Sequence, residues 1–253
     1  MSPRIMAISV GVVLLAVSAL GTWWFFFNDD APAEVSLDDA LAGLSTATAS
    51  AAGATATAVT TDAAPSATAS GSGAEVTLEG AWQVDTTQDS FVGYRIDEEL
   101  ASVGAKTAVG RASEVSGTLE FDGASITAVS VAANLQNLAS DDDRRDGQLR
   151  RQALETNDFP EATFVLTEPI VLESVPAEGE TITATAVGDL TLHGVTNSVQ
   201  LELQGQLVGG SVVVVGSTVI LLADYDIEKP SAVSVLSVSD EATMELQLYF
   251  TKA

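Results

Sequence analysis

Residues Thr181 to Leu207 read TITATAVGDLTLHGVTNSVQLELQGQL, which is two β-type runs joined by a short turn. The first run, Thr181–Leu192, is rich in Thr and in apolar residues, which suit a pleated surface. In the second run, Ser198–Leu207, apolar and polar residues alternate from Val199 onward, as in a strand with one buried face. His193-Gly194 supplies turn chemistry between them. The stretch therefore predicts two antiparallel neighbouring strands.

The same pattern extends through the C-terminal two-thirds of the chain, where turn residues such as Asp122-Gly123 and Gly209-Gly210 separate further β-type runs. About eight sequential strands with short connections favour an antiparallel meander that closes into a barrel, because closure removes exposed strand edges. We therefore expect an all-β barrel. Its expected strands are Phe91–Ile96, Ala112–Phe121, Ser125–Leu135, Ala162–Thr167, Thr181–Leu192, Ser198–Leu207, Ser211–Leu222 and Ala242–Lys252.

One strand is apolar on both faces. Val212-Val213-Val214-Val215 does not alternate, so it needs an apolar neighbour beyond the ordinary core. An eight-stranded barrel is just wide enough to hold one ligand, but its lumen can equally be filled by side chains. The sequence leaves the hollow and the filled barrel open.

Charge and composition exclude several classes of function. The formal net charge is −25, from 35 acidic and 10 basic side chains, and such a surface repels nucleic acid. The chain has no cysteine and a single histidine, so disulfides, thiolate chemistry and multi-histidine metal sites are excluded. We expect no nucleic-acid partner, no metal and no cofactor.

The N-terminal residues predict a membrane anchor. Ile5 to Phe27 carries no charge and is long enough to cross the ~30 Å hydrocarbon core. Arg4 precedes this run and Asp29-Asp30 follows it, which orients the remainder of the chain outside the cytoplasm. A cleaved signal peptide is the alternative, since Ala31-Pro32-Ala33 resembles a cleavage site. We favour a single-pass cell-membrane protein with an extracytoplasmic C-terminal domain.

The composition then divides the chain into three parts: an anchor over residues 1–30, a low-complexity Ala/Thr/Ser-rich linker over 31–79, and a folded domain over 80–253. Within the linker, Ser36 to Leu44 can form a short helix capped by Ser36, with Leu37, Leu41 and Leu44 on one side. Nine residues cannot hold a helix alone in water. Ser45 to Gly73 lacks apolar bulk and is predicted to be a disordered tether.

A second helix interrupts the β pattern at Asp141–Leu154, where acidic residues occupy the first turn. It holds four of the ten basic residues, including Arg144 and Arg145. One interpretation is a solvated helix whose arginines offset nearby acids. The other is a cap over the barrel mouth, where the arginines bind an anionic head group.

Four segments resemble the YceI-like family of polyisoprenoid-binding periplasmic proteins. They are Trp82–Asp85, Val115–Phe121, Asp141–Phe164 and Gly188–Thr196, the last being close to the family signature G-x-L-T-L-H-G-V-T. The resemblance covers Ala81 to Ala253. It implies a lipocalin-like antiparallel barrel with an elongated apolar pocket for isoprenoid chains, quinone-type lipids or fatty amides, and no catalytic activity.

Candidate ligand-binding residues follow from chemistry and position. Aromatic residues on strands can line a lumen, and arginines or the histidine can meet a head group. His193 ends a strand before Gly194, and we favour a structural role at that turn over contact with a head group. The candidates are Phe91, Tyr94, Phe121, Arg144, Arg145, Phe159, Phe164 and His193.

Two functions are carried forward. The first is non-catalytic binding of a long apolar lipid, as a carrier or sensor outside the cytoplasmic membrane. The second is a tethered structural module that contacts another envelope protein or a second copy of the chain, without ligand. A hydrolase is disfavoured because no nucleophile motif surrounds His193.

Overall fold

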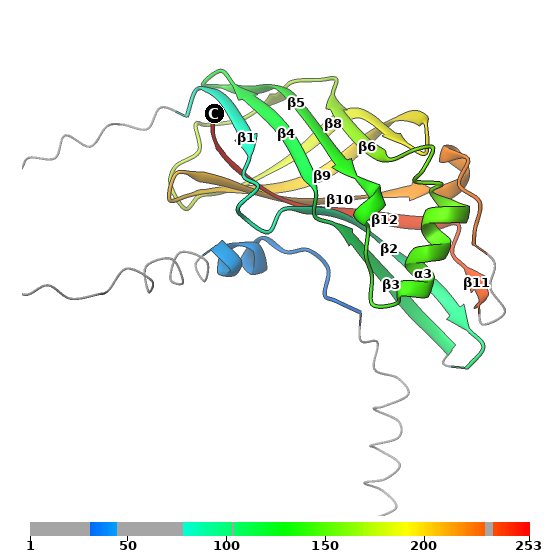
Figure 1. Ribbon diagram of the computed structural model, residues 1–253. Coiled ribbons are helices and arrows are strands. Elements are labelled where there is room, and N and C mark those ends of the chain that lie inside the picture. Colours follow the sequence, from blue (N-terminus) through cyan, green and yellow to red (C-terminus); the bar gives the residue numbers. More distant parts are fainter. Residues whose placement is uncertain (1–30, 45–77, 103, 231–234) are drawn as a thin grey trace, which may run out of the picture.

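The computed structural model describes residues 31–44, 78–102, 104–230 and 235–253 (Figure 1). The strands are β1 (Gly80–Val84), β2 (Phe91–Leu100), β3 (Gly104–Ala112), β4 (Val115–Phe121), β5 (Ser125–Asn134), β6 (Glu161–Leu166), β7 (Ile170–Val171), β8 (Thr181–Leu192), β9 (Val195–Val208), β10 (Ser211–Leu221), β11 (Val235–Val238) and β12 (Glu241–Lys252). The helical elements are η1 (Leu135–Asn137), α3 (Asp143–Gln148), η2 (Leu149–Ala153) and η3 (Leu222–Tyr225), with a further helix over residues 37–44.

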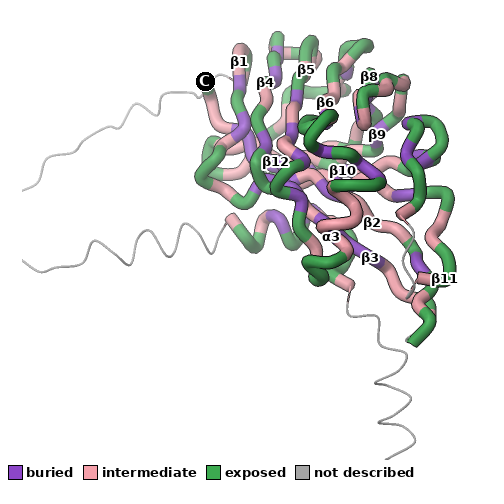
Figure 2. The backbone as a smooth tube through the Cα atoms, turned by 45° about the vertical axis from the view of Figure 1, so that its right-hand side comes forward, coloured by how far each residue is buried: buried purple, intermediate pink, exposed green. Residues whose placement is uncertain are grey.

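Eight strands form a closed antiparallel ring in the order β1-β4-β5-β6-β8-β9-β10-β12. The ring closes because β12 pairs back with β1, with Trp82 opposite Lys252 and Val84 opposite Phe250. The predicted barrel of about eight strands is confirmed. Along β4 and β8, every second residue is less exposed than its neighbours, so each strand has an inner and an outer face (Figure 2).

One strand of the ring differs from the prediction. Phe91–Ile96 was expected in the ring, but β2 pairs instead with the first half of β12 and with β3, so the β2–β3 hairpin extends the wall at one end. Gly80–Val84, which was not among the expected strands, takes the ring position between β4 and β12. Both strands use the same edge of β12, and only long-range pairing decides which of them closes the ring.

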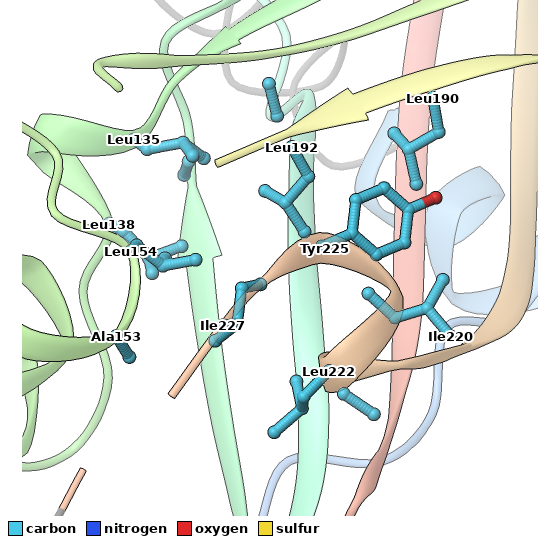
Figure 3. Close-up of a cluster of buried hydrophobic side chains, with 13 residues drawn as sticks. Leu135, Leu138, Ala153, Leu154, Leu190, Leu192, Ile220, Leu222, Tyr225 and Ile227 are labelled. Carbon is cyan, nitrogen blue, oxygen red and sulfur yellow. The ribbon is translucent and has the colours of Figure 1, made fainter. Parts of the chain in front are cut away.

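One end of the barrel, where β8 turns into β9, is filled by side chains. Figure 3 shows Tyr225 and Leu222 of η3 among Leu190 and Leu192 of β8, with Leu154 and its neighbours on the other side. The helical elements η1, η2 and η3 all contribute to this cluster, so they act as a plug. Its buried members are Ala112, Leu135, Leu138, Ala153, Leu154, Ala162, Leu190, Leu192, Ile220, Leu222, Tyr225, Ile227 and Ala242.

The predicted helix at Asp141–Leu154 is present as α3 and η2. The carboxylate of Asp142 caps it by accepting hydrogen bonds from the backbone amides of Arg144 (2.8 Å) and Arg145 (3.3 Å). These bonds hold the pKa of Asp142 below its usual range. The second half, Leu149–Ala153, widens into a π-helical turn that packs into the plug.

The helix over residues 37–44 packs on the outside of the barrel (Figure 1). Leu37 and Ala40 contact Val213, Val215 and Tyr249, all of which are buried. The Ser36 hydroxyl accepts from the Asp39 amide at 3.2 Å and donates to its carboxylate at 2.7 Å, which is the predicted cap. A helix too short to persist alone is stabilised here by tertiary packing. The same contact gives the valine run its second apolar neighbour.

The predicted membrane span at Ile5–Phe27 and most of the predicted linker lie outside the described residues. Within the described ranges, no helix combines the length and the hydropathy needed to cross a bilayer.

Candidate functional site

A cavity of about 210 Å³ occupies the lumen on the side away from the plug, toward the end that carries the β9–β10 turn. It exceeds the ~150 Å³ of an engineered apolar cavity that takes up benzene. Each ring strand contributes to its wall. Examples in ring order are Trp82, Leu119, Val131, Phe164, Ala184, Leu203, Val214 and Leu248.

Strand alternation explains why the wall is apolar. On β12, Leu246, Leu248 and Phe250 face the lumen, while Tyr249 between them packs outside against the 37–44 helix. The lining residues of the other ring strands are mostly Val, Ile, Leu and Ala, together with the aromatic Trp82, Phe121 and Phe164. The cavity therefore presents a hydrocarbon surface.

Four residues with polar side chains border the cavity: Thr163, Gln206, Thr218 and Glu245. Glu245 lies on the outward-facing phase of β12, where its Oε1 atom accepts from Arg95 Nε at 3.2 Å. Its charge is thereby paired on the outer side of the wall. Among the described residues, no group of three or more His, Cys, Asp or Glu side chains is arranged to hold a metal ion.

The family model of the YceI-like domain matches residues 82–250, a range that runs from β1 to β12 of the barrel. The chain belongs to the YceI-like domain family.

Relatives and solved structures agree with this assignment. Protein YceI of Shigella flexneri is 35% identical over 118 residues, covering 46% of this chain and 56% of the relative. A UPF0312 protein of Yersinia enterocolitica is 35% identical over 124 residues, covering 47% of this chain and 58% of the relative. The chain thus spans little more than half the length of these curated relatives.

Two solved structures share the fold at low identity. A polyisoprenoid binding domain from Saccharophagus degradans has 19% identity and a TM-score of 0.54, covering 69% of this chain and 100% of the other. BcnA of Burkholderia cenocepacia has 19% identity and a TM-score of 0.51, covering 66% and 98%. At such identity the likeness establishes the barrel architecture of the YceI-like domain.

The YceI-like barrel brings two of the sequence candidates to the cavity. Phe121 of β4 and Phe164 of β6 both line it, from different heights of the wall. The lining residues that the sequence did not single out are mainly Val, Ile, Leu and Ala. Their phase was visible in the alternation of strands such as β9, where Leu201 and Leu203 face inward. Which inward positions border a void was not visible.

Phe91 and Tyr94, both on β2, lie away from the cavity. Phe91 is on the outer face, where the guanidinium of Arg111 stacks 4.1 Å from its ring centroid. Tyr94 points into the plug cluster, and its hydroxyl has no hydrogen-bond partner among the described residues. Burial raises the pKa of the Tyr94 phenol. Val92, between the two, is the β2 residue that reaches the cavity.

The α3 arginines do not line the cavity either. Arg145 is held by ion pairs with Glu98 of β2, at 2.6 Å, and with Asp141. Arg144 is exposed on the helix surface. The helix therefore joins the plugged end of the barrel to the β2–β3 hairpin, and this geometry supports the interpretation in which the arginines offset nearby acids.

His193 and Phe159 belong to one contact set at the β8–β9 turn. His193 Nδ1 lies 3.0 Å from the Tyr225 carbonyl oxygen, and Nε2 lies 3.1 Å from Glu155 Oε2. The Phe159 ring meets the imidazole edge-on at 4.6 Å between centroids. These contacts link the turn to η3 and to the segment after η2, which supports a structural role for His193.

Proposed function

We propose that this protein binds a long apolar lipid, such as an isoprenoid or quinone-type lipid, in the barrel cavity without catalysing a reaction. The single observation that carries the proposal is a lumen that is hollow on one side and walled by apolar side chains from every ring strand. The alternative, a ligand-free structural module, predicted a lumen filled from end to end.

The energetics favour a hydrocarbon ligand. Transfer of a chain from water into an apolar site contributes ~0.8 kcal/mol per CH₂ group. Strong binding therefore needs few polar contacts, and the cavity wall offers few. The polyisoprenoid binding domain from Saccharophagus degradans has the same fold, which supports the same class of ligand here.

We also propose that residues 5–27 anchor the protein in the cell membrane and leave the barrel outside the cytoplasm. The support is the uncharged run itself, with Arg4 before it and Asp29 and Asp30 after it. Arg95 of β2 donates from Nη2 to the Pro32 carbonyl at 2.7 Å, and the 37–44 helix packs on β10 and β12. Because contact with the barrel begins this early in the chain, the anchor would hold the barrel close to the membrane surface rather than on a long tether.

The anchor has a direct test. Mass spectrometry of the membrane-bound protein should recover peptides from residues 1–30. Their complete absence from the mature protein would instead support the cleaved signal peptide.

Ligand binding is tested by filling the cavity. Ala184 lines it, so Ala184→Trp should abolish the uptake of a fluorescent prenyl probe and remove any lipid that accompanies the purified protein in native mass spectrometry. Val165→Trp is the matched control, because Val165 sits on the neighbouring outer surface with 47% of its area exposed. If the wild-type protein carries no lipid and takes up no probe, the proposal fails.

A further inference from the structure

The hollow and the filled parts of the lumen meet at a definite layer of side chains. Five residues line the cavity and also belong to the plug cluster or pack against it: Val92, Ala162, Phe164, Leu190 and Met244. They come from β2, β6, β8 and β12, so together they reach across the lumen. These five residues form the floor of the cavity.

Phe164 is the largest side chain of this floor. In the sheet, Phe164 is paired with Leu190 of the neighbouring strand β8 on one side and with Val131 of β5 on the other. Its ring lies over Gly188, because a Cβ at Gly188 would be 2.3 Å from Phe164 Cζ. The Phe164 ring therefore occupies space that is free because residue 188 has no side chain, and close packing against Gly188 fixes the position of the ring.

In the described part of the chain, the plug behind the floor is built from buried side chains that contact one another. Tyr225 has 1% of its area exposed, Leu192 has 3% and Leu222 has 9% (Figure 3). Opening a path there would require η3 or η2 to leave the barrel. Among the described residues the plug closes this end of the cavity, so we expect a ligand to enter from the end of the β9–β10 turn.

We propose that the floor, and Phe164 above all, sets the longest tail that the cavity accepts. This inference rests on the proposed lipid binding. The ligand enters tail first, its terminal methyl group meets the floor, and its polar end stays at the opposite rim. The class of ligand is thus a single-tailed amphiphile whose buried length is fixed by the distance from rim to floor.

The test is a series of prenyl alcohols, namely geraniol, farnesol, geranylgeraniol and solanesol, measured by displacement of a fluorescent prenyl probe. For the wild-type protein, affinity should rise by about fourfold for each further CH₂ that is buried, and then stop rising at a limiting length. In Phe164→Ala, the loss of the ring deepens the cavity, so this limit should move to a longer alcohol.

Phe121→Ala is the matched control. It removes the same ring from the cavity wall outside the floor, so it should leave the limiting length unchanged. Both variants should be checked for thermal unfolding, and Phe164→Leu gives a smaller truncation if Phe164→Ala does not fold.

The outcomes separate the two proposals. If the wild-type protein binds the alcohols but the limiting length is the same in Phe164→Ala, Phe164→Leu and Phe121→Ala, the role of the floor is overturned. The proposed lipid binding is then left intact. Affinity that keeps rising through solanesol in the wild-type protein would have the same two consequences. Failure of the wild-type protein to bind any alcohol or the probe would overturn the proposed function itself.

Discussion

The hydroxyl of Tyr249 donates a hydrogen bond of 2.7 Å to the backbone carbonyl of Ala40, and both residues are almost fully buried. The bond joins the last ring strand to a helix that precedes β1 in the chain by more than thirty residues. It shows that the 37–44 helix, which the sequence placed within the linker, packs against the barrel. Tyr249→Phe should therefore cost ~1 kcal/mol of stability, because the Ala40 carbonyl loses the hydroxyl donor and Gln247 Nε2 loses an acceptor while the ring is kept.

Tyr94→Phe is the matched comparison for that variant. The Tyr94 hydroxyl is buried without a partner in the described part of the chain, so its removal should be neutral or stabilising. Urea unfolding of both variants checks the pair. An equal loss of unfolding free energy in the two variants would mean that the Tyr249 hydrogen bond makes no net contribution to stability.

Leu37 is the larger of the two buried side chains by which the 37–44 helix contacts the barrel, the other being Ala40. Leu37→Ala should weaken its docking, by an amount within the ~2–5 kcal/mol typical of buried Leu→Ala changes. Hydrogen exchange should then speed up in residues 37–44, and Val213 and Val215 should become accessible to apolar dyes. Asp38→Ser changes an exposed position of the same helix and should leave exchange unaltered. Rapid exchange of this helix in the wild-type protein would contradict the docked arrangement.

The rim of the cavity predicts a preference for neutral head groups. Glu178 and Glu180 lie at the rim, the end of the barrel that carries the β9–β10 turn, where their carboxylates accept from the Gly209 and Ala177 amides. The Lys252 ammonium at the same end donates to the Leu78 and Glu79 carbonyls. Farnesol should therefore bind more tightly than farnesyl phosphate at low salt. The gap should narrow at 1 M salt, where the screening length falls to ~3 Å.

The double variant Glu178→Gln, Glu180→Gln should reduce the difference in affinity between farnesol and farnesyl phosphate without added salt. Equal binding of the two ligands by the wild-type protein, at every salt concentration, would show that the rim charge plays no part.

His193→Ala should lower stability by roughly 1–2 kcal/mol, because two hydrogen bonds at the β8–β9 turn are lost. Its backbone also has a positive φ of 52°, which Asn tolerates better than Ala, so His193→Asn should lose less. Affinity for the prenyl probe should be unchanged in both variants, since His193 does not line the cavity. Lost probe binding in a fully folded variant would instead place His193 at the ligand.

Acid should weaken the start of α3. The Arg144 and Arg145 amides lower the pKa of Asp142 in the folded protein below its ordinary value of 3.8. A depressed folded pKa gives stability that is present above the unfolded pKa and lost as the pH falls below it. The wild-type protein should therefore lose stability below about pH 4 more steeply than Asp142→Asn, which keeps a capping side chain but does not titrate. Parallel pH profiles would exclude this contribution.

The sequence predicted much of the architecture for a local reason. Alternation in stretches such as Ser198–Leu207 reflects the pleat of a single strand, so the inward phase of Leu201 and Leu203 could be predicted without knowing their neighbours. The non-alternating run Val212–Val215 likewise predicted a covered outer face. The cap at Ser36 and the acidic start of α3 are local signals of the same kind.

The sequence by itself determined an antiparallel barrel of about eight strands, a short helix at Asp141–Leu154 and an apolar valine strand that must be covered on both sides. The tertiary structure alone decided that β1 rather than β2 closes the ring, that the 37–44 helix supplies the cover, and that Phe164 meets a void while Tyr94 meets a plug. The reason is physical: a strand's two faces follow from its own pleat, whereas a void is the volume left when side chains from many distant strands have packed together.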